Sequence, residues 1–294
     1  MKKKSRVTQT ILNLTFIIFC SMIAIPFVML VSASLSSEQD IIDYGYAIFP
    51  RSISFEAYKY VFKNPKSILD AYKTTITFSV TQTFLSVLLS AMFAYPLSKP
   101  HLRGKKYLNF YLYFTALFSG GLVPSYILQT RYLHLNDTIW VYIIPGLIGS
   151  YHVFMMRTFF KEIPYEITES MMMDGASEYT IFFRSIVPLS KPVLATVALL
   201  KFLGNWNSWY TTMLYIDNAE LYSLQYLLQK ILRDIAFLQE HADLSMSMIM
   251  DLMDVPTETV RMAMAIVVAG PALVIFPFFQ KYFVKGMTVG AVKG

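Results

Sequence analysis

Residues 74–98 read TTITFSVTQTFLSVLLSAMFAYPLS, and no charged residue lies between the flanking Lys73 and Lys99. A run of this length is sufficient for an α-helix of about 20 residues to cross the hydrocarbon core of a membrane. Four more uncharged runs are Val7–Ser37, Tyr107–Thr130, Thr138–Met156 and Met262–Gln280, and a sixth run, Pro192–Ile216, is interrupted only by Lys201. The sequence therefore predicts an all-α membrane protein with six transmembrane helices. We expect spans at about residues 10–34, 74–98, 107–130, 138–158, 190–215 and 260–282.

The composition agrees with this fold class. Of the 294 residues, 55% are hydrophobic and 15% are charged, whereas a soluble domain carries about 25% charged residues. The net charge of +6 could suggest a nucleic-acid partner. The basic residues, however, lie at the ends of the apolar runs and not on one patch, so we expect a lipid bilayer and no nucleic acid as the partner.

Basic residues at the span ends predict the orientation. They gather before the first span, in the segment Lys99–Lys106, in the segment Arg157–Lys191 and in the tail from Lys281. The positive-inside rule then gives cytoplasmic termini, with loops 35–73 and 217–258 outside. The N-terminal apolar run is too long for a signal peptide, so we expect a retained first helix. No linker or repeat divides the chain, which predicts one domain over residues 1–294.

The sequence lacks the patterns of common catalytic sites. It has no G-x-x-x-x-G-K-[ST] phosphate loop, no H-E-x-x-H zinc motif and no G-x-S-x-G nucleophile elbow. Its four histidines are scattered along the chain. We therefore expect no catalytic residue, no metal site and no cofactor in this chain, which argues against a membrane enzyme.

The cytoplasmic segment at residues 161–189 contains the most informative stretch. From Pro164 to Pro188 it reads PYEITESMMMDGASEYTIFFRSIVP. Pro164 suits the start of a helix, Gly175 suits the residue after a helix end, and Ser177 can cap a second helix. The pattern predicts two short helices bent at Gly175. The run Met171–Met173 suits insertion into a partner's groove; alternatively, the segment packs under its own helix bundle.

This segment resembles the EAA loop of ATP-binding-cassette importer permeases, whose pattern is E-A-A, three residues, Gly, nine residues and I-x-L-P. Glu169, Gly175 and Pro188 stand at the required spacing. The chain departs from the pattern where Ser170 and Met171 replace the two alanines, Ser185 replaces the isoleucine and Val187 replaces the leucine. The tail Gln280–Gly294 resembles that of the MalG-like carbohydrate branch. The stretch Ser190–Trp209 is similar to the complex polysaccharide and oligosaccharide permease subgroup.

The resemblance implies a permease subunit of a heteromeric importer in the bacterial cytoplasmic (inner) membrane. Its partners would be a second homologous permease, two ATPase subunits that bind ATP and Mg, an extracytoplasmic solute-binding protein and an oligosaccharide. The segment 161–189 would form coupling helices against the ATPase, and the tail 290–294 would reach between the ATPase subunits. The coupling residues would be Glu169, Met172, Asp174, Gly175 and Ala176.

The fifth span carries the candidate residues for the translocation path. Polar and aromatic residues at positions 201, 205, 208, 209 and 212 would form one stripe on a continuous helix. Aromatic planes suit the C–H faces of sugars, amides suit their hydroxyls, and Lys201 would be a counter-charge for an acidic, alginate-type sugar. The candidates are Lys201, Asn205, Trp206, Asn207, Trp209 and Tyr210. Alternatively, these groups join helices or form an interfacial aromatic belt.

An ion-coupled secondary transporter is the alternative class of protein. An ion-coupled secondary transporter would need acidic or histidine residues inside its spans to carry protons or sodium. The five uncharged runs contain no Asp or Glu. The sequence therefore favours the ATP-driven importer.

Overall fold

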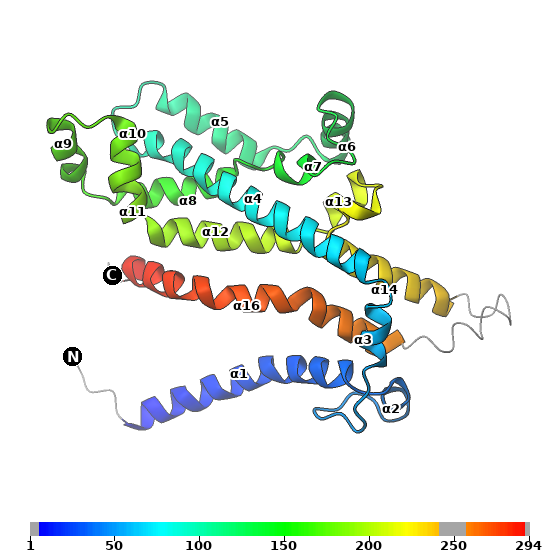
Figure 1. Ribbon diagram of the computed structural model, residues 1–294. Coiled ribbons are helices and arrows are strands. Elements are labelled where there is room, and N and C mark those ends of the chain that lie inside the picture. Colours follow the sequence, from blue (N-terminus) through cyan, green and yellow to red (C-terminus); the bar gives the residue numbers. More distant parts are fainter. Residues whose placement is uncertain (1–5, 241–256, 292–294) are drawn as a thin grey trace. The chain divides into compact units, whose positions relative to one another are not determined.

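The computed structural model describes residues 6–240 and 257–291, and in these residues the chain is helical with no β-strand. The longer elements are α1 (Arg6–Ser34), α4 (Pro65–Ser98), α5 (Lys105–Leu117), α8 (Ser150–Lys161), α12 (Lys191–Trp206), α14 (Leu224–Glu240) and α16 (Thr257–Ala291) (Figure 1). The shorter α-helices are α2 (Glu38–Tyr44), α3 (Glu56–Val61), α6 (Leu122–Ile127), α7 (Trp140–Ile143), α9 (Tyr165–Met173), α10 (Glu178–Ile181), α11 (Val187–Leu189) and α13 (Tyr210–Tyr215). Two π-helical segments, η1 (Leu128–Tyr132) and η2 (Phe182–Ile186), and the 3₁₀ turn η3 (Ala219–Leu221) complete the described chain.

Three helices of the described chain are long and apolar enough to cross a membrane: Thr8–Ser34, Pro65–Ser98 and Thr257–Pro277. Two further pairs pass the same test together but are bent, by 109° between α5 and the α6–η1 segment and by 79° between Glu178–Leu189 and α12. The predicted all-α membrane protein is thus confirmed at the level of its helical architecture. The number of six spans stays a prediction.

Three of the predicted spans are not single continuous helices. The span at 107–130 is broken because α5 ends before Gly120 and Gly121, where Gly121 adopts a φ of +87°. The span at 138–158 is broken between α7 and α8, where Pro145 is followed by Gly146 at a φ of +74°. The span at 190–215 is broken between α12 and α13. Glycine takes positive φ without a Cβ penalty, so it allows the first two of these turns.

The chain divides into two compact units, which are described separately. The first comprises residues 1–68 and 228–271, and the second comprises residues 69–227 and 272–294. The boundaries fall inside α4, α14 and α16. The predicted single domain over 1–294 stays a prediction. Helix α14 begins within the predicted outer loop 217–258, and residues 241–256 of that loop lie outside the described residues.

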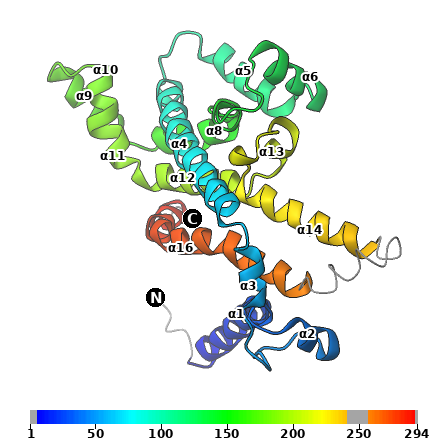
Figure 2. The ribbon, with the colours of Figure 1, turned by 45° about the vertical axis from the view of Figure 1, so that its right-hand side comes forward.

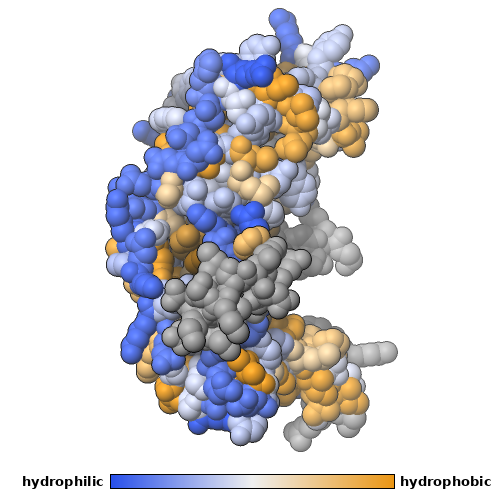
Figure 3. All heavy atoms as spheres, turned by 90° about the vertical axis from the view of Figure 1, so that its right-hand side faces the viewer, coloured by the Kyte–Doolittle hydropathy of each residue, from blue (hydrophilic) through white to orange (hydrophobic). Residues whose placement is uncertain are grey.

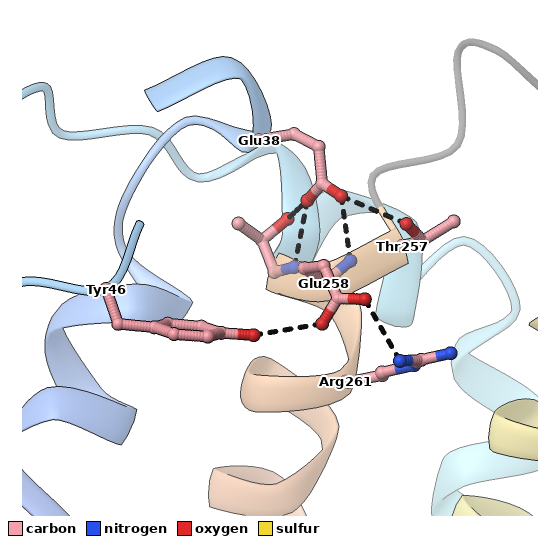
Figure 4. A network of polar contacts seen from close by, with 6 residues as sticks. Glu38, Tyr46, Thr257, Glu258 and Arg261 are labelled. Carbon is pink, nitrogen blue, oxygen red and sulfur yellow. Dashed lines mark hydrogen bonds and ion pairs between the residues drawn. The ribbon is translucent and has the colours of Figure 1, made fainter. Parts of the chain in front are cut away.

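In the first unit, a glutamate of α2 holds the start of α16 (Figure 4). The Glu38 carboxylate accepts hydrogen bonds from the backbone amides of Glu258 and Thr259 at 2.8 and 2.9 Å. It also accepts from the hydroxyls of Thr257 and Thr259 at 3.0 and 2.8 Å. The first amides of a helix lack partners within the helix, so Glu38 acts as their cap. Glu258 in turn accepts from Tyr46 Oη at 3.0 Å.

In the second unit, two hydrophobic clusters form the core. In Figures 1 and 2, α8 lies beside α5 and α12, consistent with their residue contacts. One cluster joins the end of α4 to α8, η2 and α12, and its fully buried members include Ala94, Val153, Met156, Ile181 and Val197. The other cluster surrounds Phe78 and Tyr142, whose rings stack at 4.4 Å. These clusters position the two sites described below.

Large hydrophobic side chains also lie on the surface. Figure 3 shows hydrophobic residues exposed between hydrophilic ones on one face of the molecule. On α1, Phe16 and Met22 expose 65% and 72% of their surface. Such exposure is unusual for a soluble protein and is expected where lipid covers the side chains.

Candidate functional site

The bent segment between α9 and α10 forms as the sequence predicts. Gly175 adopts a φ of +76°, and its amide donates to Met172 O at 3.0 Å. The amide of Ala176 donates to Met171 O at 3.0 Å. These two bonds make a Schellman motif, which ends α9 and requires a left-handed residue at Gly175. Ser177 Oγ then accepts from the Thr180 amide at 3.3 Å and caps α10.

The predicted coupling residues lie together at this bend, and most of them are exposed. Glu169, Asp174 and Gly175 are exposed, and Met172 exposes 37% of its surface. Ala176 is half-buried and packs, with Met171, against the core cluster. The neighbouring Met173 exposes 85% of its surface. The methionine run is therefore divided, since Met171 faces its own bundle while Met173 is available to another molecule.

The bend is joined to the fifth predicted span by a wide turn. The π-helix η2 follows α10 directly, and Ser190 separates the end of α11 from the start of α12. Short π-helical segments occur often at functional sites, because the inserted residue changes the direction of the side chains. Phe182, Ser185 and Ile186 of η2 are buried. The turn therefore anchors the exposed bend to the bundle.

The sequence pattern did not single out one residue of this segment that makes contacts with α4. Glu178 of α10 accepts a hydrogen bond from Tyr95 Oη of α4 at 2.9 Å and forms an ion pair with Lys99. Burial raises the pKa of the Glu178 carboxyl, but the hydrogen bonds from Lys99 and Tyr95 outweigh it, so the net pKa is lowered. Glu178 is 83 residues from Tyr95 in sequence. No local pattern could have linked the two.

A cavity of about 370 Å³ lies farther along α4 and α12. Its lining combines aromatic rings with hydrogen-bonding groups. The lining residues from α4 and α7 are Phe78, Gln82, Val141 and Tyr142, and those from α12 onward are Lys201, Gly204, Asn205, Ser208, Tyr210, Thr211, Leu214 and Tyr215. Leu122, Ser125, Gln129 and Pro145 complete it.

The break between α7 and α8 forms one wall of this cavity. Gln82 Nε2 donates to Pro145 O at 2.7 Å and to Ile143 O at 3.2 Å. Lys201 Nζ donates to Gly146 O at 3.1 Å. A broken helix leaves carbonyl oxygens without partners, which is costly away from water. Gln82 and Lys201 satisfy these oxygens, and Lys201 thereby joins α12 to this break, as the alternative of helix-joining groups allowed.

The residues predicted for the translocation path separate in the structure. Lys201, Asn205 and Tyr210 line the cavity. The prediction of one continuous polar stripe was wrong because α12 ends at Trp206 and α13 begins at Tyr210. Residues after the break therefore no longer follow the periodicity of α12.

The other three predicted path residues do not line the cavity. Trp206 exposes only 2% of its surface and stacks on Phe202 at 5.7 Å. Asn207 donates to Leu203 O at 3.0 Å, within its own helix end. Trp209 is half-buried against Tyr210, with ring centroids 5.7 Å apart.

A second, larger cavity of about 730 Å³ lies under α9. Its charged lining residues are Lys99, Lys105, Lys161, Glu162 and Glu166. In the described ranges 6–240 and 257–291, no group of three or more His, Cys, Asp or Glu side chains could hold a metal ion.

Comparison with known proteins decides the family. The family of binding-protein-dependent transport system inner membrane components matches residues 1–289. The chain belongs to this family. It is a permease subunit of an ATP-binding-cassette importer, as the EAA-like segment predicted, and it is not itself an enzyme.

Individual relatives match the permease along nearly its whole length. It is 34% identical to Protein LplC of Bacillus subtilis (strain 168), over 92% of this chain and 89% of that protein. It is 32% identical to the polygalacturonan/rhamnogalacturonan transport system permease protein YtcP of the same organism, over 99% and 100% of the two chains. A solved bacterial ABC transporter, described as involved in import of the acidic polysaccharide alginate, matches with a TM-score of 0.81 and 28% identity, covering 96% of this permease and 99% of that chain.

Proposed function

We propose that this permease forms, with a second homologous permease, the path by which an acidic oligosaccharide crosses a bacterial inner membrane. Two ATPase subunits would bind ATP and Mg, and an extracytoplasmic binding protein would deliver the sugar. The described substrates of two similar proteins, polygalacturonan or rhamnogalacturonan in one case and alginate in the other, support an acidic sugar.

In this proposal the chain crosses the membrane six times, with both termini in the cytoplasm. The three long helices, the bent pair of α5 with α6–η1, and α12 of the second bent pair would supply five spans. The sixth would be the broken pair of α7 and α8, whose free carbonyls are satisfied by Gln82 and Lys201. Backbone of this kind is tolerated at membrane depth where it is buried in protein or lines a cavity. Discontinuous helices of transporters often line substrate sites.

The observation that carries the coupling role is the exposed bend between α9 and α10. Glu169, Asp174 and Met172 present charge and flexible apolar surface there, which suits insertion into a partner's groove. Gly175 would set the angle between the two helices, and Ala176 would anchor it. The residues of the tail at 292–294 lie outside the described chain, so contact of the tail with the ATPase rests on the family resemblance.

The cavity between α4, α7 and α12 would hold part of the sugar. Asn205 and Gln82 could bond hydroxyl groups, and Tyr210 offers a ring face. Lys201 uses one of its three donors on Gly146 O, so two donors remain for a carboxylate. Trp206, Asn207 and Trp209 would support this wall and not contact the sugar.

The test measures sugar uptake into proteoliposomes that contain this permease, its partner permease and the ATPase subunits. The binding protein is loaded in turn with each of a panel of neutral and acidic oligosaccharides. ATP-dependent uptake of an acidic sugar is the expected result. Uptake that follows an ion gradient without ATP would contradict the importer.

A matched pair of variants tests the role of Lys201. Lys201→Arg keeps the positive charge, whereas Lys201→Gln keeps a donor for Gly146 O and removes the charge. We expect the preference for acidic over neutral sugar to survive in the first variant and to fall at least tenfold in the second, which corresponds to about 1.4 kcal/mol. An unchanged preference in Lys201→Gln would exclude Lys201 as the counter-charge.

A further inference from the structure

A small cluster of contacts joins the coupling segment to α4. The Glu178 carboxylate of α10 accepts from Tyr95 Oη at 2.9 Å and pairs with Lys99 Nζ. Lys99 Nζ also lies 4.8 Å from the centre of the Tyr95 ring. Phe182 of η2 also packs against Tyr95, with the two ring centroids 5.4 Å apart. We call Tyr95, Lys99 and Glu178 the α4–α10 clamp.

The clamp is built on well-packed groups. Tyr95 and Phe182 expose 8% and 3% of their surface and belong to the core cluster of the second unit. The Lys99 side chain exposes 21%. Only Glu178 is largely exposed, at 55% of its side chain. An isolated exposed ion pair contributes little to stability. Here two donors at the end of one helix, Tyr95 and Lys99, hold the same carboxylate, which fixes the position of Glu178 as well as pairing its charge.

The clamp lies where α4 is locally weak. Pro96 stands between the two donors, and proline removes one helical hydrogen bond and disturbs the turn before it. Other groups hold the carbonyls at this helix end. Ser98 Oγ donates to Tyr95 O at 2.6 Å, and Arg157 Nε donates to Leu97 O at 3.2 Å. The last turn of α4 is therefore tied to α10 on one side and to α8 on another.

The same helix reaches the cavity. Gln82 and Phe78 of α4 line it, and Gln82 lies 13 residues before Tyr95, which is about 20 Å along an α-helix. Gln82 also holds the break between α7 and α8. Thus α4 physically connects the segment 161–189 to the cavity wall. The clamp is the polar contact between that segment and the C-terminal end of α4.

We infer that Glu178, Tyr95 and Lys99 are positioning residues that transmit movement of the coupling segment to α4 and hence to the cavity. This inference rests on the proposed coupling function. Without the clamp, α9 and α10 would still meet the ATPase, but their displacement would be absorbed by the turn at η2 instead of moving α4.

The experiment is a charge-exchange series in the reconstituted complex. The variants are Glu178→Gln, Tyr95→Phe, Lys99→Glu, Glu178→Lys and the double exchange Lys99→Glu with Glu178→Lys. Arg103→Gln is the control, because this exposed charged side chain lies outside the segment 161–189 and makes no hydrogen bond or ion pair among the described residues. The readouts are ATP hydrolysis with and without loaded binding protein, and the amount of sugar transported per ATP.

We expect each single charge reversal to lower the stimulation by loaded binding protein at least fivefold and to lower sugar transported per ATP. Glu178→Gln and Tyr95→Phe, which keep shape, should lower both about twofold. The double exchange should recover at least half of the wild-type stimulation, which a merely structural loss would not do.

Two outcomes would overturn the inference: wild-type stimulation in Glu178→Gln and Tyr95→Phe, or a double exchange no better than the single reversals. If the charge reversals fail to assemble, the two shape-keeping variants decide the question. A wild-type complex without stimulated hydrolysis would instead contradict the proposed function itself, so the two failures are distinguishable.

Discussion

Replacing Glu38 by alanine should open the first turn of α16. The substitution removes four hydrogen bonds, two of them from the backbone amides of Glu258 and Thr259. One hydrogen bond to a charged group contributes about 1.5–3 kcal/mol, and loss of a helix cap costs about 0.5–2 kcal/mol. Because all four bonds end on one carboxylate, they do not add. We expect a cost of about 2 kcal/mol, or about a 30-fold increase in the opening of this turn.

Amide hydrogen exchange measured by mass spectrometry in lipid nanodiscs reports this opening directly. Glu38→Ala should accelerate exchange at Glu258 and Thr259 about 30-fold, whereas Glu38→Gln, which retains one acceptor oxygen, should accelerate it about fivefold. Asp43→Asn is the control, since this exposed carboxylate of α2 accepts only from Gln39, at 3.0 Å, among the described residues. Equal exchange in Glu38→Ala and Asp43→Asn would refute the cap.

Three further predictions concern the second unit. Tyr142→Phe removes hydrogen bonds to Thr212 Oγ1 at 2.8 Å and to Leu221 O at 2.8 Å, so it should lower the free energy of unfolding by about 1–3 kcal/mol; thermal unfolding in detergent measures this, and the exposed Tyr151→Phe should cost less. Gly146→Ala places a Cβ at a φ of +74° and 3.5 Å from Lys201 Nζ, so it should lower the free energy of unfolding by about 1–2 kcal/mol and reduce sugar uptake. Gly270→Ala in α16 is the control, because no atom lies within 4 Å of the added Cβ, and equal losses of stability and uptake in the two variants would contradict the role of the break. The pKa of Glu178 lies below its ordinary value of 4.5, so its carboxylate is charged and the clamp is complete above that value, and the clamp is lost as pH falls through the lowered pKa. The ratio of stimulated hydrolysis between wild type and Glu178→Gln should therefore stay constant from pH 6 to pH 8, and a fall in this ratio within that window would contradict the lowered pKa.

Local features of the coupling segment could be predicted from the sequence. A left-handed position at Gly175 and a cap at Ser177 depend on residues within one helical turn of each other. The apolar runs likewise predicted helices, because length and lack of charge are local properties. These elements formed where the sequence indicated, although three of the predicted spans are broken.

The contacts that define the sites could not be predicted in this way. Glu38 meets Glu258 across 220 residues, and Gln82 meets Pro145 across 63 residues. Pro145 and Gly146 permit a helix break but do not demand one, since prolines are tolerated in transmembrane helices. Trp206 carries an indole that suits a sugar as well as a core, and only packing against Phe202 decides between them.

The most direct test of the account is whether the bend at Gly175 couples ATP hydrolysis to delivery of the sugar. The complex of both permeases and the ATPase subunits is reconstituted in liposomes, and hydrolysis is measured with and without loaded binding protein. Glu169→Ala and Gly175→Pro are compared with wild type and with Arg103→Ala, an exposed residue outside the segment 161–189, after assembly of each complex has been confirmed. The account predicts stimulation in wild type and the control, and its loss in the other two variants. Full stimulation in both Glu169→Ala and Gly175→Pro would contradict it.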